Sequence, residues 1–387
     1  MDYPICEEEL NGAQYNGYLI LARPMVGNMG PHAVTSEILP LTSSRFIAAF
    51  AVILYHTAFP FVPGLSAVPM FSAIVEHGNS AVDFFFALSG YILTLTYSPR
   101  TYDKTSFFVA RFARVYPVYA FALLVDLPFF IFFRHSRDGA DAWSRIAVTV
   151  AAYIPLLQAW LVMIGKVWCL PGWSLSCEAF FYAVFPFIEP RRKQISLFEF
   201  SVLSWIMISI AVSYASPRID NPNIRLMLSW NPLLHLPSFL LGIACVELTE
   251  ARKRMLWLLG SVSFIAMWFS PSVQPIPLFG LAILALHGLS TGTIMSSRLM
   301  VLLGRASYAM YLLHWPIWRL FGFFGHREHE LEYRGDSPAL WICYLVTVIL
   351  ASIAVHHWVE NPARQFITTY WKQRQLKTAF APDPGTR

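Results

Sequence analysis

Charged residues are scarce in this chain. They make up 13% of its 387 positions, whereas hydrophobic residues make up 56% and the mean hydropathy is +0.50. Ordinary soluble domains carry about 25% charged residues, so this composition excludes a soluble globular class and predicts a polytopic membrane protein. The net charge of +5 is distributed over the polar segments between apolar runs. That distribution favours a role in membrane topology, and we expect no nucleic-acid partner.

Cysteines are few and show no metal-binding spacing. The chain has five of them, none in a C-x-x-C pair, and three lie in or beside apolar segments. An odd set without paired spacing indicates neither a disulfide framework nor a zinc site, so no metal is expected. The five are Cys6, Cys169, Cys177, Cys245 and Cys343.

The chain also lacks a recognisable signal peptide and an internal repeat. Its first residues are acidic (Glu7, Glu8 and Glu9), without the basic region and apolar run of a secretory signal, so we expect residues 1–40 to be a cytoplasmic leader. An inverted-repeat transporter would show matching interrupted segments in its two halves, and none is found. We therefore expect one transmembrane domain over 41–365 and a cytoplasmic tail over 366–387.

What the chain has in abundance is apolar segments, with Trp and Tyr near their ends as is typical of interfacial anchors. They predict an all-α fold, a polytopic transmembrane helix bundle. The segments lie near 45–63, 80–97, 115–133, 146–164, 173–188, 198–215, 231–249, 255–270, 274–290, 300–323 and 338–358.

Basic residues between these segments predict the topology. If all basic clusters are cytoplasmic, an even number of crossings separates each cluster from the next. Three apolar segments lie between Arg114 and Arg191, so one of them should not span. We place a re-entrant segment around 160–182, where Gly165, Lys166, Pro171 and Gly172 interrupt the pattern. About ten spans remain, with both termini cytoplasmic. The alternative is that one basic loop faces outward.

An arginine and a histidine stand inside the first apolar segment. Arg45 and His56 are eleven positions apart, about three helical turns, so they share one helix face and lie roughly 16 Å apart along its axis. An ionisable side chain at membrane depth is costly and marks a protein interior or a wet cavity. Guanidinium suits phosphate or carboxylate recognition, and imidazole exchanges protons near neutral pH. We expect both to face one polar tunnel. The alternative is a snorkelling arginine and a hydrogen-bonded histidine.

Two carboxylates also lie in apolar surroundings. Asp83 begins the second segment, where it either sits at the interface or orients a neighbouring basic group. Glu178 precedes Tyr182 by one helical turn, so the phenol is a candidate partner for the carboxylate. A carboxylate in this context is paired with a cation or protonated.

The remaining histidines give weaker indications of function. His314 precedes Pro316, and we expect it to hydrogen-bond a carbonyl freed by the proline kink. His356 and His357 diverge on a helix and make a poor metal pair, so with Glu360 they are placed at the cytoplasmic surface.

Seven pieces of sequence, taken together, resemble the acyltransferase-3 family of integral membrane O-acyltransferases, in its stand-alone glycan O-acetyltransferase form. The resemblance runs from residue 41 to about 365. The pieces are, in family order, LTSSRFIAAFAVILYH, GNSAVDFFFALSGYIL, RFARVYPVY, WSLSCEAFFYAVFP, LPSFLLGI, ASYAMYLLHWP and WVENPAR.

The resemblance implies a ten-span core and an acyl-CoA donor, here expected to be acetyl-CoA, reached from the cytoplasm. It matches Arg45 and His56 to the family's essential Arg and His, and Glu178 to the glutamate of its WSLxxE motif. Arg111 and Arg114 match the basic pair before Tyr-Pro. The sequence departs from the pattern at Cys177, Ala179 and Ser238, which puts the substrate in doubt more than the reaction.

Acyl transfer from a thioester to an alcohol requires a base, an oxyanion donor and a clamp for the donor phosphates. We assign the base to His56. Arg45 is expected to bind the donor phosphate or polarise the thioester, helped by Arg111 and Arg114. Glu178 or Asp83 would fix the imidazole tautomer. In a second possibility His56 itself carries the acyl group.

The sequence thus predicts a bacterial inner-membrane enzyme that moves an acetyl group from acetyl-CoA to a hydroxyl of a surface glycan or lipid-linked saccharide. The expected partners are the acyl-CoA, the saccharide acceptor and membrane lipids. The alternatives are a transporter or flippase for a lipid-linked sugar, which would not consume the thioester, and a non-catalytic receptor.

Overall fold

The computed structural model describes residues 37–98, 101–161, 167–269, 273–324, 333 and 335–379. Residues 1–36 of the predicted leader, Gly165, Lys166 and residues 380–387 of the predicted tail lie outside these ranges.

The described residues form helices and no strands, as the composition predicts. Short 3-10 turns connect several of the helices. The α-helices are α1 (Leu39–Phe61), α2 (Pro69–Glu76), α3 (Ala81–Tyr97), α4 (Lys104–Asp138), α5 (Ala142–Tyr153), α6 (Gly172–Ile188), α7 (Leu197–Ala215), α8 (Pro222–Trp230), α9 (Pro232–Ala244), α10 (Glu250–Phe269), α11 (Ile276–His287), α12 (Arg298–Phe324), α13 (Pro338–Val355) and α14 (Asn361–Ala379).

Each predicted apolar segment overlaps a helix, and six stretches of the described residues are long and apolar enough to cross a bilayer. They contain α1, α3, α4 with α5, α7, α9, and α13 with α14. Helix α12 is 27 residues long but carries Arg298, Arg305 and Arg319, so its composition is more polar. The protein is a helical membrane protein, and the count of ten spans stays a prediction.

The stretch between α5 and α6 departs from the expected pattern. Helix α5 ends at Tyr153, well short of the expected 164, and α6 begins at Gly172, inside the segment we expected to be re-entrant. The described backbone between them is non-helical, and Leu156 has a φ of 61°. A re-entrant path for this stretch stays a prediction.

Polar contacts inside the protein satisfy this non-helical backbone. The buried Gln158 amide donates to the Gly172 carbonyl at 2.5 Å, and the Ser176 hydroxyl donates to the Leu156 carbonyl at 2.5 Å. The Trp168 backbone amide donates to the Tyr153 hydroxyl at 3.1 Å. Irregular backbone at membrane depth is tolerated where protein supplies such partners.

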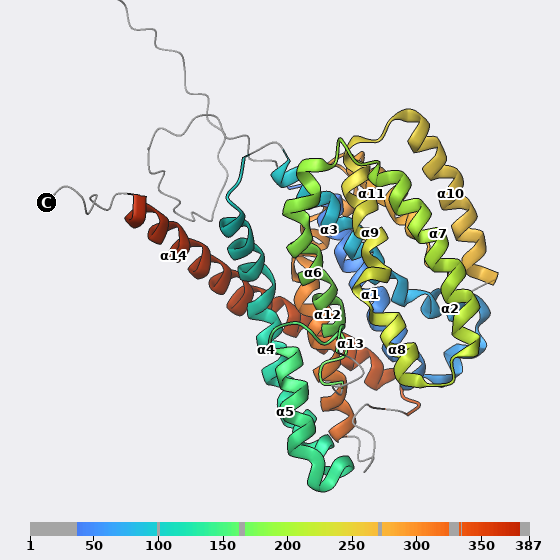
Figure 1. Cartoon of the computed structure of the whole chain (residues 1–387). Helices are drawn as coiled ribbons and strands as arrows, with labels where there is room; N and C mark the ends of the chain where they lie inside the picture. The colour runs from blue at the N-terminus through green and yellow to red at the C-terminus, as the bar shows by residue number, and fades with distance from the viewer. Residues whose placement is uncertain are drawn as a thin grey trace, which may run out of the picture. The chain divides into compact units, whose positions relative to one another are not determined.

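Two helix pairs, α1 with α12 and α3 with α9, form the centre of the bundle, and α1 also contacts α3 (Figure 1). The contact of α3 with α9 is close because each helix presents a glycine to the backbone of the other. A Cβ at Gly90 would overlap the Phe239 carbonyl oxygen, and a Cβ at Gly242 would overlap that of Ala87. Small residues such as Gly90 and Gly242 permit this close helix contact.

Candidate active site

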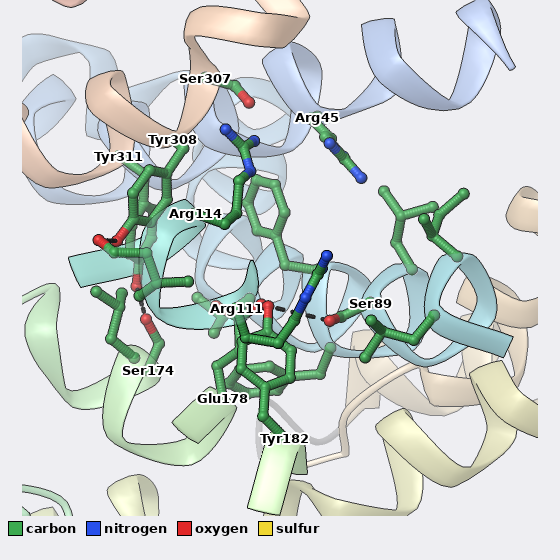
Figure 2. Close-up of a pocket in the computed structure, with 18 residues that line it drawn as sticks. Arg45, Ser89, Arg111, Arg114, Ser174, Glu178, Tyr182, Ser307, Tyr308 and Tyr311 are labelled. Carbon is green, nitrogen blue, oxygen red and sulfur yellow. Dashed lines mark hydrogen bonds between the residues drawn. The ribbon is translucent and has the colours of Figure 1, made fainter. Parts of the chain in front are cut away.

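Arg45, Arg111 and Arg114 line one cavity of about 130 Å³, which we call the arginine pocket. Helices α1, α3, α4, α6 and α12 supply its walls. Figure 2 shows Arg45 and Arg111 reaching into it from α1 and α4. Ser89, Ser174, Glu178, Tyr182, Ser307, Tyr308 and Tyr311 also line it.

The three arginines differ in how far their charge is already compensated. Arg114 forms an ion pair with Glu360, whose side chain is buried, and its guanidinium lies 5.7 Å from the centre of the Tyr308 ring. Arg111 lies about 6 Å from three aromatic rings and donates to the Tyr97 hydroxyl at 3.4 Å. Among the described residues, Arg45 has neither an ion pair nor a hydrogen bond. Arg45 is therefore the cation best placed to meet an anionic ligand.

Glu178 is held at the wall of the arginine pocket by two hydroxyls. Tyr182 donates to its Oε1, which confirms the predicted pairing across one helical turn, and Ser89 donates to the same oxygen at 3.3 Å. The Ser89 bond ties α3 to α6, and the two bonds together fix a carboxylate in the cavity that contains the arginines.

His56 opens on a second, larger cavity of about 420 Å³, which we call the histidine pocket. Its wall includes Asp83, His235 and three tryptophans. The tryptophans are Trp173, Trp205 and Trp230. Arg45 and His56 thus lie on one helix as predicted, but they line two cavities rather than a single tunnel.

The two pockets follow one another along the same helices and meet at Val82 and Tyr311, which line both. The Tyr311 hydroxyl is hydrogen-bonded to the Ser174 hydroxyl at 2.8 Å. Val82 and this hydroxyl pair therefore stand where a substrate would pass from one pocket to the other.

Asp83 is buried and bonded to α9. His235 Nδ1 lies 3.0 Å from its Oδ1, and the Ser238 hydroxyl donates to the same oxygen at 2.6 Å. His235 Nε2 lies 2.9 Å from the Ser229 carbonyl oxygen. Because a carboxylate and a carbonyl both only accept, this geometry assigns a proton to each ring nitrogen and makes His235 a cation paired with Asp83. The alternative in which Asp83 orients a basic group is the one observed.

The ring of His314 stacks against that of His56, with centroids 5.4 Å apart and planes 22° apart. His314 Nδ1 lies 2.6 Å from the Tyr311 carbonyl oxygen, which confirms a bond to a backbone carbonyl, although the carbonyl that Pro316 frees is that of Leu312. The Tyr311 oxygen accepts the Nδ1 proton, which leaves Nε2 as an acceptor. In the described part of the chain this buried Nε2 has no hydrogen-bond partner.

Neither candidate for fixing the His56 tautomer is bonded to it. Within the described residues, Glu178 accepts from Tyr182 and Ser89, and Asp83 from His235 and Ser238. The described residues also hold no cluster of His, Cys, Asp and Glu side chains with metal-ligand geometry.

Sequence reasoning missed one residue that lines a pocket, His235, and two that contact pocket residues, His314 and Glu360. His235 was passed over, His314 was assigned a purely structural part, and Glu360 was placed at the surface although it is buried against Arg114. Each becomes meaningful only through a partner on another helix, and no local spacing signals such a partner.

Comparison with known proteins assigns residues 41–357 to a family model described as an acyltransferase domain. The acyltransferase MdmB of Streptomyces mycarofaciens is 27% identical over 89% of this chain and 95% of its own length. The exopolysaccharide production protein ExoZ of Rhizobium meliloti (strain 1021) is 25% identical over 74% of this chain and 89% of its own. A putative peptidoglycan O-acetyltransferase, YrhL of Bacillus subtilis (strain 168), is 23% identical over 80% of this chain and 55% of its own. No solved structure matches.

Proposed function

The chain belongs to the acyltransferase-3 family of membrane acyltransferases, and from that premise we propose that it moves an acetyl group from acetyl-CoA to a hydroxyl of a surface glycan or lipid-linked saccharide. The names of two relatives, an exopolysaccharide production protein and a putative peptidoglycan O-acetyltransferase, support a saccharide acceptor. We place the enzyme in a bacterial inner membrane with both termini cytoplasmic.

One observation carries the proposal. A single helix, α1, places a guanidinium in one cavity and an imidazole in the next, and the two cavities meet at Val82 and Tyr311. A cationic pocket suits the donor, which carries phosphates. A titratable ring in the adjoining pocket suits the acceptor hydroxyl, which must lose a proton.

The size of the arginine pocket limits what part of the donor enters it. A cavity of about 130 Å³ lies below the range of about 300–1,000 Å³ that is typical of sites enclosing a whole small ligand. It therefore admits a narrow chain rather than a nucleotide. We propose that the pantetheine arm enters past Arg45 while the nucleotide stays outside, so Arg45 contacts a phosphate or polarises the thioester carbonyl. Arg111 and Arg114 add positive potential without binding directly.

The chemical step then needs one base. The acceptor oxygen attacks the thioester carbonyl carbon, and its proton passes to the free ring nitrogen of His56. The carbon–oxygen bond forms, the carbon–sulfur bond breaks, and the CoA thiolate leaves with the proton returned by the imidazolium. Neither Glu178 nor Asp83 acts here as a partner of His56, because Glu178 is bonded to Tyr182 and Asp83 to His235.

Thiol release from acetyl-CoA tests the proposal. Full-length protein in detergent should release CoA thiol when a saccharide acceptor is present, and mass spectrometry should find the O-acetyl product. His56→Ala should reduce the rate by at least 100-fold, the contribution of a general base. His357→Ala is the matched control. The His357 side chain is exposed just after the end of α13, so this variant should keep full activity. Full activity of His56→Ala would overturn the assignment of the base, and absence of thiol release by the unaltered protein would overturn the function.

A further inference from the structure

The histidine pocket has an aromatic wall whose orientation is fixed by stacking. The Trp173 ring lies parallel to that of Trp230, with centroids 6.1 Å apart and planes 5° apart, and 5.1 Å from the His235 ring. Phe86 lies edge-on to Trp173 at 6.4 Å. Trp230 is buried, whereas Trp173 is half-buried and lines the cavity. Trp173 therefore offers a rigid, flat apolar surface to whatever occupies the pocket.

The same cavity offers hydrogen-bond acceptors that the protein leaves unused. The Oε1 atom of Gln274 is buried and, in the described part of the chain, accepts no hydrogen bond. Both hydrogen bonds that the structure records for the Asp83 carboxylate are to Oδ1, so Oδ2 can still accept a hydrogen bond from a ligand. A buried acceptor without a donor is costly, and hydroxyl groups of a ligand would satisfy both. A ligand with a flat C–H face and several hydroxyls at its edge is a saccharide ring.

Charge separates this pocket from its neighbour. Among the described residues that line it, Asp83 and His235 compensate one another, His56 is the other histidine, and no Lys, Arg or Glu is present. The arginine pocket, in contrast, has three arginines. An anionic sugar would gain nothing here that repays its desolvation, because no uncompensated cation meets it.

We propose, on the basis of the function proposed above, that the histidine pocket binds the acetyl-accepting residue as a neutral pyranose ring stacked on Trp173, with its hydroxyls held by Asp83 and Gln274. The volume of about 420 Å³ falls in the range of small-ligand sites. His56 lines the same cavity, so a hydroxyl of a ring stacked in this way can reach the base. Uronic acids and the diphosphate of a lipid carrier stay outside the pocket.

The test compares neutral and anionic acceptors at saturating acetyl-CoA. The probes are the methyl pyranosides of glucose, galactose, mannose and N-acetylglucosamine, together with methyl glucuronide and galacturonide. At least one neutral glycoside should support thiol release with a kcat/KM at least tenfold above that of both uronides. Equal or better use of the uronides would overturn the proposal. So would release of thiol to water with no response to any neutral glycoside, a result that leaves the acyltransferase function standing. No thiol release under any condition would overturn the proposed function itself.

Substitutions then assign the binding surface. Trp173→Ala should raise the KM for the neutral glycoside at least tenfold relative to the KM for acetyl-CoA, and Trp173→Phe should recover most of that loss by restoring a flat ring. The readout is the ratio of the KM for the glycoside to the KM for acetyl-CoA, because misfolding would impair the use of both substrates. Trp257→Ala, on the exposed face of α10, is the matched control and should change neither value. An unchanged ratio in Trp173→Ala would remove Trp173 from the acceptor site.

Discussion

At the scale of single residues, the arginine pocket distinguishes its cations by what they already contact. Glu360 compensates Arg114, and aromatic rings surround Arg111. Arg45, half-buried on α1, lacks such a fixed partner among the residues that the structure describes. A ligand phosphate would gain most by meeting Arg45, and this difference gives the first prediction.

Arg45→Lys should raise the KM for acetyl-CoA about tenfold and change kcat less. A guanidinium binds phosphate through two parallel hydrogen bonds and an ammonium through one point charge, a difference of about 1.4 kcal/mol for a factor of ten. Initial rates of thiol release over a range of acetyl-CoA concentrations measure it. Arg298→Lys, at the exposed start of α12, controls for a general effect of lysine. An Arg45→Lys enzyme with unchanged dependence on acetyl-CoA would remove Arg45 from the donor site.

The residue scale also shows how far sequence reasoning extends. The bond between Tyr182 and Glu178 is predictable because both lie on one helix, one turn apart. The pairing of Asp83 with His235 joins positions 152 residues apart, and the stacking of His56 on His314 depends on the register of α1 against α12. No pattern within a segment contains that register, so these two contacts needed the structure.

At the scale of helices, the apolar segments were recognisable because length and hydropathy are local properties. Helix pairing is not local, although the glycines that allow it are visible in the sequence. The buried ion pair of Asp126 on α4 with Arg319 on α12, with 2.7 Å between oxygen and nitrogen, was missed for the same reason. It joins two helices that supply walls of the arginine pocket.

Asp126→Ala should destabilise the protein by about 3–5 kcal/mol, because it removes the carboxylate that compensates the buried Arg319 cation. The double replacement Asp126→Leu with Arg319→Met should recover most of that loss. Thermal unfolding in detergent, followed by size-exclusion chromatography, measures both. Glu250→Ala breaks an exposed pair with Lys253 and should leave the midpoint unchanged. A midpoint for Asp126→Ala equal to that of the unaltered protein would show that the pair is not needed for stability.

Gly242→Ala should push α9 away from α3, because the added Cβ would overlap the Ala87 carbonyl. Overpacking of this kind costs about 1–3 kcal/mol, and the shift would also pull His235 away from Asp83. We expect a lower unfolding midpoint together with a higher KM for the acceptor. Gly64→Ala is the control, since nothing lies within 4 Å of a Cβ at that position. An unchanged unfolding midpoint and an unchanged KM in Gly242→Ala would show that the contact of α3 with α9 accommodates a methyl group without moving.

At the scale of the whole molecule, the order of the two pockets along the helices links the chemistry to the membrane. Along α6, Trp173 lines the histidine pocket and Tyr182 the arginine pocket, and the basic residues Arg191 to Lys193 follow the end of the helix. The arginine pocket is thus the one nearer the basic, predicted cytoplasmic end. A donor made in the cytoplasm and an acceptor on the outer side would enter from opposite ends and meet at Val82 and Tyr311.

Accessibility to an impermeant maleimide tests this arrangement. In a background with Cys6 and Cys343 replaced by serine, the other three native thiols are buried. Asn79→Cys places a thiol at the exposed rim of the histidine pocket, and Lys193→Cys places one at the exposed basic end of α6. Asn79→Cys should be labelled in intact spheroplasts, and Lys193→Cys only after the membrane is permeabilised. Labelling of both from one side would require an even number of crossings between residues 79 and 193, and transfer across the membrane between two separately accessible pockets would then be excluded.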